Sequence, residues 1–214
     1  MRHYKRNQIE EAISRLFGEQ SAEPSSGLRT RIKRLLDTDR GLGRNTRANR
    51  PELANYAFYS SDSPGKGAEV SFSNYEAFAL MIGLQMLNHN WPQMFAVETL
   101  RLNRSELEER HTHILSRDPK MLFDEKRIRL AAKPGRPVLK TASPVFLLIW
   151  SDNRYFKDPA AVAPSAKIFD DEDTALRFTL GKAGRSTTWL ELTKPAHVLS
   201  SELSRTLPRK RGRS

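Results

Sequence analysis

Apolar residues recur at helical spacing in two long stretches in the first half of this chain of 214 residues. Residues 4–17 carry one apolar stripe, and Gly18 is a typical residue to follow the end of a helix. Residues 74–88 carry a wider stripe, and Ser73 can cap a helix there. Because so much of the second stretch is apolar, we expect this helix to form the core of an N-terminal domain.

The stretch between these helices, residues 27–50, combines an apolar stripe with many basic residues. Four apolar residues fall on one side of a helix, at positions i, i+4, i+7 and i+8 counted from Leu28, and Ser25 or Ser26 can cap this helix. From about residue 37 to 54 the composition predicts a loop. The basic residues fall largely off the apolar stripe, and they are Arg29, Arg31, Lys33, Arg34, Arg40, Arg44, Arg47 and Arg50.

Two short segments after the basic stretch are typical of β-strands. Residues 56–59 (YAFY) and 69–72 (EVSF) flank a turn rich in Ser, Pro and Gly, so we predict a hairpin with Lys66 at its tip. Further along the chain, Pro92 suits the first turn of a helix that extends towards Leu115.

The last third of the chain has a different pattern. Residues 145–150 (VFLLIW) are an unbroken apolar run, as in a strand that is buried on both faces, and a loop is predicted after them. A helix is predicted after the acidic residues 170–173, followed by a strand at 187–192 and a helix at 195–207. The predicted fold class is α+β. Its parts are a mostly helical winged helix-turn-helix-like domain with a β-hairpin at 1–116, a linker at 117–143, a small α/β unit at 144–207 and a basic tail at 208–214.

Composition narrows the classes of function. The chain has 36 Lys and Arg against 25 Asp and Glu, a formal net charge of +11, which favours an anionic partner such as DNA or RNA. It has no cysteine, which excludes disulfides, cysteine-ligated zinc and thiol nucleophiles. No secretory signal is visible after Met1, and the apolar run at 145–150 is far too short to span a bilayer. We therefore expect a soluble, cytoplasmic protein without a membrane partner.

The sequence contains no arrangement that supports catalysis, so we expect no enzyme, no cofactor and no bound metal. His111 and His113 stand two residues apart, so on a helix they point to different sides and do not share a metal, and surface charge is the favoured interpretation. The acidic run at 170–173 could bind a divalent cation, but helix capping explains it more simply.

The order of the predicted elements in the first half resembles the MerR-type winged helix-turn-helix family. The segment GLRTRIKRLLDTDR resembles the recognition helix of that family, with Leu28, Arg29 and Arg31 at matching positions. The segment EVSFSNYEAFALMIGLQML resembles the second strand of the wing and the helix that follows it, and the resemblance covers residues 4–102. It implies that the basic helix enters the major groove and that the hairpin tip lies on phosphates. The residues that it assigns to DNA are Arg29, Arg31, Lys33 and Arg34 for bases or phosphates, Arg44, Arg47 and Arg50 for the backbone, and Lys66 for the wing.

The sequence therefore predicts a DNA-binding protein that acts as a transcriptional regulator. Its expected partner is duplex DNA, and the sequence leaves open whether it forms a homodimer or responds to a small molecule. The alternative function is a non-enzymatic adaptor or RNA-binding protein that uses the same basic surface. A solvated helix face that happens to be basic is the simplest alternative for residues 27–50.

Overall fold

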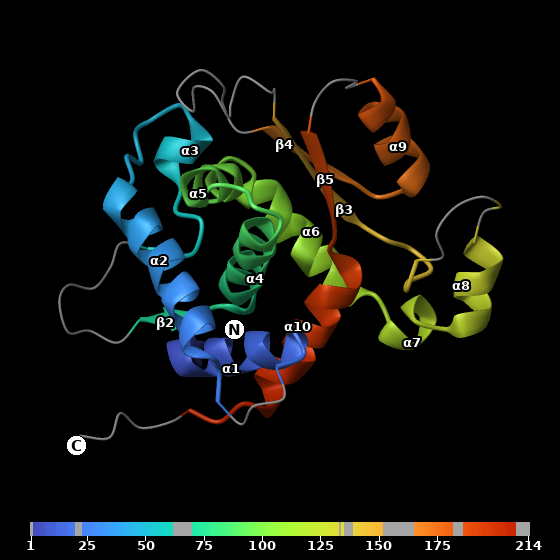
Figure 1. Cartoon of the computed structure of the whole chain (residues 1–214), viewed down its shortest axis with the longest axis horizontal. Helices are drawn as coiled ribbons and strands as arrows, with labels where there is room; N and C mark the ends of the chain where they lie inside the picture. Colours follow the sequence, from blue (N-terminus) through green and yellow to red (C-terminus); the bar gives the residue numbers. More distant parts are fainter. Residues whose placement is uncertain are drawn as a thin grey trace. The chain divides into compact units, whose positions relative to one another are not determined.

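The structure, a computed structural model, describes residues 2–19, 23–61, 70–132, 134, 139–151, 165–181 and 186–208. These residues form helices and two small antiparallel sheets, which confirms the predicted α+β class (Figure 1). The chain divides into two compact units, Met1–Arg104 with Val198–Ser214 (unit 1) and Ser105–His197 (unit 2). These bounds differ from those of the predicted domains, whose limits remain a prediction.

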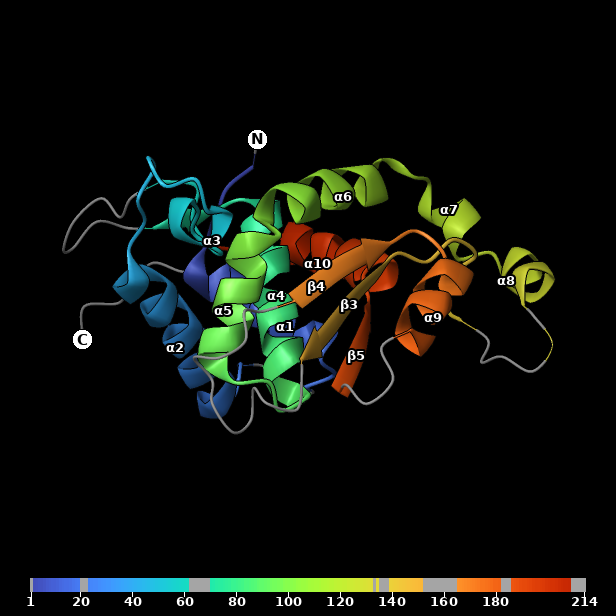
Figure 2. The ribbon, with the colours of Figure 1, turned by 90° about the horizontal axis from the view of Figure 1, so that it is seen from above.

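Unit 1 is built mainly of helices packed around α4 (Figure 1). Its elements are β1 (Tyr4–Lys5), α1 (Arg6–Leu16), α2 (Ser26–Leu42), α3 (Pro51–Ala54), β2 (Ser71–Phe72), α4 (Asn74–Asn88), α5 (Gln93–Leu102) and the last part of α10 (Thr193–Arg205). The predicted helices at 4–17 and 74–88 are confirmed as α1 and α4. Helix α2 contacts α1, α4 and α5 and lies at the periphery of the unit (Figure 2).

Helix α4 forms the core of unit 1, as predicted, because nearly all of its residues from Tyr75 to Met86 are buried. The predicted cap is also confirmed. The hydroxyl of Ser73 accepts a hydrogen bond from Glu76 N at 3.1 Å, and the carboxylate of Glu76 accepts one from Ser73 N at 2.6 Å. This reciprocal arrangement supplies partners for amides that the first turn of a helix leaves unsatisfied.

Gly83 lies where α4 approaches its neighbours closely. A Cβ atom at this position would stand 3.2 Å from Leu35 Cδ1, 3.4 Å from Leu100 Cδ1 and 3.4 Å from Phe58 Cζ. We expect Gly83→Val to lower the free energy of unfolding by about 1–3 kcal/mol, because the larger side chain overpacks the core. Urea unfolding followed by circular dichroism measures this free energy. Gly41→Val is the control, because a Cβ atom there meets nothing within 4 Å. Equal stability of the two variants would contradict close packing around Gly83.

The predicted hairpin of residues 56–59 and 69–72 is wrong. Residues 56–59 are not in a strand, and β2 pairs with β1 instead. The physical reason is that two backbone amides of the first segment donate to the carboxylate of Asp39, so they are not available to a neighbouring strand. Lys66, the predicted tip of the hairpin, lies outside the described residues, as do most residues of the predicted basic tail.

Helix α2 is longer than predicted. The loop expected at 37–54 begins only after Leu42, and it contains the short helix α3. Asp39 is fully buried and extends the buried side of α2 by a further turn. The helix ends at Leu42, and the next residue, Gly43, has a φ of 61°, which lies in the region that favours glycine.

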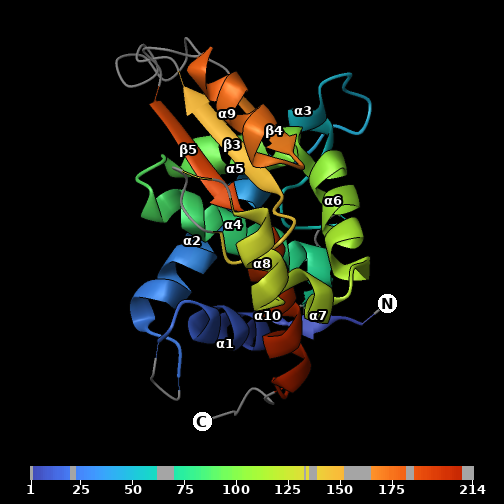
Figure 3. The same ribbon diagram turned by 90° about the vertical axis from the view of Figure 1, so that its right-hand side faces the viewer.

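Unit 2 contains a three-stranded antiparallel sheet with α9 on one face (Figure 3). Its elements are most of α6 (Arg104–Ser116), α7 (Pro119–Leu122), α8 (Glu125–Ala131), β3 (Phe146–Ser151), β4 (Ser165–Phe169), α9 (Glu172–Leu180), β5 (Ser186–Glu191) and the first residues of α10. The strand order is β4-β3-β5, and Leu148 of β3 lies opposite Lys167 and Trp189. Leu148, Phe169 and Ala175 form a buried cluster between the sheet and α9.

The predicted strands at 145–150 and 187–192 are confirmed as β3 and β5, and the unbroken apolar run of β3 fits its central place in the sheet. The sequence predicts a loop where β4 forms, and the pairing of β4 with β3 is antiparallel. The α/β interpretation of this part of the chain is therefore corrected to an antiparallel sheet. The residues of the predicted linker include α7 and α8.

The acidic run at 170–173 caps α9, as predicted. The side chain of Asp171 accepts a hydrogen bond from Thr174 N at 2.8 Å, and this bond holds the pKa of Asp171 below its usual value. Among the described residues, no helix is both long enough and apolar enough to cross a lipid bilayer.

Candidate nucleic-acid interface

Helix α2 has one side in the core of unit 1 and the other in solvent. Ser25 precedes the first residue of the helix, and its hydroxyl accepts a hydrogen bond from Leu28 N at 3.2 Å, which confirms one of the two predicted caps. The buried side consists of Leu28, Ile32, Leu35, Leu36 and Asp39. These residues span about three turns, so the exposed side has a defined orientation on the unit.

The basic residues of α2 lie on the side that faces solvent. Lys33 and Arg34 are exposed, whereas Arg29 and Arg31 are half-buried at its borders. Arg29 forms an ion pair with Glu23 at 2.9 Å. Within the part of the chain that the structure describes, Arg31, Lys33 and Arg34 form no ion pair with a carboxylate. Their charges therefore remain available to an external anion.

The basic residues that follow α2 differ in their exposure and in the groups that they contact. Arg47 is exposed, and Arg50 is exposed but forms an ion pair with Glu52. Arg44 is half-buried, with its guanidinium 5.5 Å from the centre of the Tyr56 ring. The structure thus groups the basic residues of α2 on one side of a helix and leaves the other three on the segment between α2 and α3.

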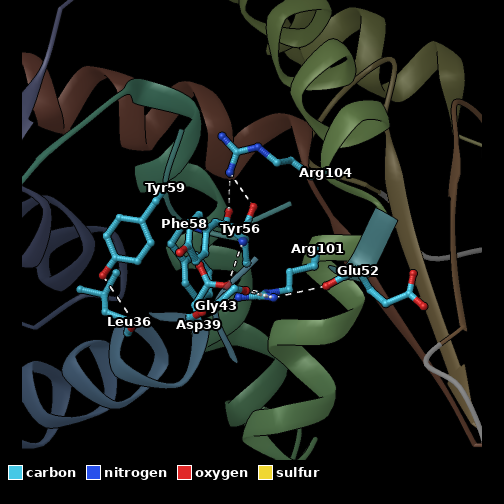
Figure 4. A network of polar contacts seen from close by, with 10 residues as sticks. Leu36, Asp39, Gly43, Glu52, Tyr56, Phe58, Tyr59, Arg101 and Arg104 are labelled. Atoms are coloured by element: carbon cyan, nitrogen blue, oxygen red, sulfur yellow. Dashed lines mark hydrogen bonds and ion pairs between the residues drawn. The ribbon is translucent and has the colours of Figure 1, made fainter. Parts of the chain in front are cut away.

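A buried ion pair joins α2 to α5 and to the segment after α2 (Figure 4). Arg101 of α5 is 1% exposed, and its Nε donates to Asp39 Oδ1 at 2.6 Å. Its terminal nitrogens donate to the carbonyl oxygens of Asp39, of Gly43 at 2.8 Å and of Glu52 at 3.3 Å. The carboxylate of Asp39 also accepts from two backbone amides of residues 56–59, at 3.0 Å and 2.9 Å. The pair therefore supplies hydrogen-bond partners to backbone amides and carbonyls between α2 and α4, most of which belong to no helix or strand.

Arg104 also fixes residues 56–59, because its guanidinium donates hydrogen bonds to backbone carbonyl groups of this segment (Figure 4). Its Nη1 donates to Tyr56 O at 2.7 Å and to Ala57 O at 3.3 Å, and its Nη2 lies 3.8 Å from Glu76 Oε1. The same carboxylate oxygen of Glu76 accepts a hydrogen bond from Ser60 Oγ at 2.5 Å. The capping residue of α4 therefore also anchors the segment that passes over the end of α2.

Tyr59 places a buried aromatic ring beside the last turns of α2. Its hydroxyl accepts a hydrogen bond from Arg40 Nη2 at 3.2 Å, and the Arg40 guanidinium lies 5.2 Å from the ring centre. Burial raises the pKa of Tyr59 to about 12, so the hydroxyl stays neutral and donates to Leu36 O at 3.5 Å. Arg40 is exposed, and its contacts with Tyr59 fix the position of its guanidinium group. It adds a basic group at this end of α2.

The sequence pattern alone did not single out Asp39, Arg101 or Arg104. One signal was present, because Asp39 continues the apolar stripe of α2 three residues after Leu36, where a charge needs a buried partner. Arg101 gives a similar signal, since it follows the buried residues of α5 at helical spacing. Which acid pairs with which arginine depends on tertiary contacts between residues far apart in the sequence.

In unit 2, the predicted exposure of His111 is wrong. His111 is 4% exposed, whereas His113 is exposed, so the two rings do point to different sides of α6. Burial, together with a smaller contribution from the charge of His197, lowers the pKa of His111 to about 4. A ring nitrogen of His197 lies 3.0 Å from Ile114 O. No group of three or more metal-ligating residues occurs among the residues that the structure describes.

The fold and this surface define the class of protein only coarsely, as an α+β protein whose first unit presents a helix with a basic, solvent-exposed side. The chain matches no model of a known protein family and no curated protein. A function is therefore inferred from the side chains of α2 and of the segment that follows it.

Proposed function

We propose that the protein binds duplex DNA through the exposed basic side of α2, as a transcriptional regulator does. The observation that carries this proposal is the exposure of Lys33 and Arg34, with Arg31 beside them, on a helix whose opposite side is buried. A rigid helix with cationic groups on its outer side can enter the major groove, where arginine and lysine contact guanine edges and phosphates.

The relation between α1 and α2 also supports the proposal. The two helices pack against each other, and Nη2 of Arg6 donates to Arg29 O at 3.3 Å. In helix-turn-helix proteins the second helix of such a pair enters the groove while the first supports it. Arg44 and Arg47, on the segment after α2, are the candidates for phosphate contacts next to the groove.

The resemblance to MerR-type proteins stays part of this proposal for the helices α1, α2 and α4. The wing of that family is not part of the proposal, because residues 56–59 are bound to Asp39 and Arg104 and form no strand. We therefore propose that the segment between α2 and α3, with its basic residues, lies against the DNA backbone in place of a hairpin.

A salt titration of duplex binding tests the proposal. We expect the full chain to bind a labelled random-sequence duplex with an affinity that falls steeply between about 50 and about 200 mM salt. The double variant Arg31→Ala/Arg34→Ala should bind at least about tenfold more weakly and should lower the slope of log affinity against log salt by about 2. Fluorescence anisotropy at several salt concentrations gives both quantities.

The matched control is Lys126→Ala/Arg127→Ala, which removes the same charge from two exposed positions of α8. If both double variants lose affinity equally, binding depends on net charge and α2 is not the interface. The same titration with single-stranded DNA and with RNA examines the alternative function. A clear preference for RNA over the duplex would favour the RNA-binding function instead.

A further inference from the structure

The exposed side of α2 carries one acidic residue among its basic ones. Thr30, Lys33, Arg34 and Asp37 are all exposed and follow one another at helical spacing, so they form a single stripe opposite the buried side. With a rise of 1.5 Å per residue the stripe is about 10 Å long, which corresponds to about three base pairs of DNA. The stripe is therefore long enough to meet several neighbouring base edges.

Asp37 is not held in an ion pair on its own helix. Lys33 and Arg34 precede it by four and three residues, yet among the described residues no ion pair joins Asp37 to either of them. Asp37 also lies far from the N-terminus of α2, where the helix dipole favours a carboxylate. Arg40, three residues after Asp37, forms no ion pair with it either, so no described cation is paired with this carboxylate.

A carboxylate in this stripe weakens its attraction for phosphate. On a surface that only followed the DNA backbone through charge, Asp37 would lower the affinity. In the major groove a carboxylate has a specific use, because it accepts a hydrogen bond from N4 of cytosine. Lysine and arginine beside it pair with O6 and N7 of guanine, so the stripe is chemically suited to G·C-containing steps.

We infer that Asp37 is a specificity-determining residue that selects cytosine in the major groove. Lys33 and Arg34, its neighbours on the stripe, contact the adjacent guanines or phosphates. This inference rests on the proposed binding of duplex DNA by α2. It adds a sequence preference that electrostatic attraction alone does not provide.

Selection from a random duplex library tests the inference, using the full chain and three variants. The unchanged protein should enrich a motif with cytosine at one position, preferred over the other bases by between about 5-fold and about 100-fold. Asp37→Ala should lose this preference while its affinity for random duplex stays equal or rises. Asp37→Asn should move the preference at that position to adenine, because an amide pairs with N6 and N7 of adenine. Glu109→Ala, which removes an exposed carboxylate of α6, should leave the motif unchanged.

The outcomes separate the inference from the function on which it rests. Binding without any sequence preference, or an Asp37→Ala variant that still selects cytosine, overturns the role of Asp37 and leaves duplex binding intact. Loss of the preference in both Asp37→Ala and Glu109→Ala also overturns it, because the effect then follows net charge. Absence of duplex binding by the unchanged protein overturns both proposals.

Discussion

The Asp39→Ala variant is expected to lose about 3–5 kcal/mol of the free energy of unfolding of unit 1. The substitution leaves the guanidinium of Arg101 buried without its carboxylate, and it removes the acceptor of two backbone amides in residues 56–59. An uncompensated buried charge and unsatisfied buried amides both destabilise a fold strongly. Because a domain is stable by only about 5–15 kcal/mol, urea unfolding should show a large shift of the midpoint.

Asp37→Ala is the matched control, since it removes the same group two residues earlier on the exposed side of α2. It should change the free energy of unfolding by no more than about 0.5 kcal/mol. The double variant Asp39→Leu/Arg101→Met removes both buried charges and should recover only part of the loss, because the carbonyl groups of Gly43 and Glu52 also lose their donor. A loss below about 1 kcal/mol in Asp39→Ala would contradict the structural role of the pair.

Acid is expected to destabilise unit 2 through His111. In the fold the pKa of this ring is lowered from 6.5 to about 4, mainly by burial, whereas in the unfolded chain it returns to about 6.5. Between these values the unfolded chain binds a proton that the folded unit does not, so stability falls as the pH falls from about 6.5 to about 4. A difference of this size corresponds to about 3 kcal/mol, and below about pH 4 the loss is complete.

Urea unfolding at about pH 7 and at about pH 4.5 measures the effect. His111→Phe, which cannot titrate, should lose much of the pH dependence, and His113→Phe at the exposed position should retain it. Burial raises the pKa of Glu191, so this group acts in the opposite direction and gains stability as the pH falls. The comparison between the two histidine variants removes this contribution, and equal pH profiles for both would show that His111 is not the cause.

Local signals predicted the elements that depend on local interactions. Ser73 and Glu76 form a capping box within one turn, and the helix that they begin is apolar enough to form the core. The acidic residues before α9 likewise act on their own helix. Such contacts join residues three or four positions apart, so the sequence already contains both partners.

The predicted hairpin is the instructive error, because its two segments have the composition of strands. The structure gives the backbone groups of residues 56–59 other partners, the carboxylate of Asp39 and the guanidinium of Arg104. Strand propensity describes how well a segment fits a half-buried sheet, and it does not decide which groups the segment finds. The strand β2 consequently pairs with β1 at the start of the chain.

The sequence by itself determined the helices α1 and α4 of unit 1, the central strand of unit 2, and the basic helix α2 up to about residue 36. Only the tertiary structure decided that Lys33 and Arg34 stay in solvent while Asp39 and Arg101 meet in the core. The physical reason is distance along the chain. Helical spacing follows from neighbours within a turn, whereas a buried charge is tolerated only where folding brings an opposite charge from a distant segment.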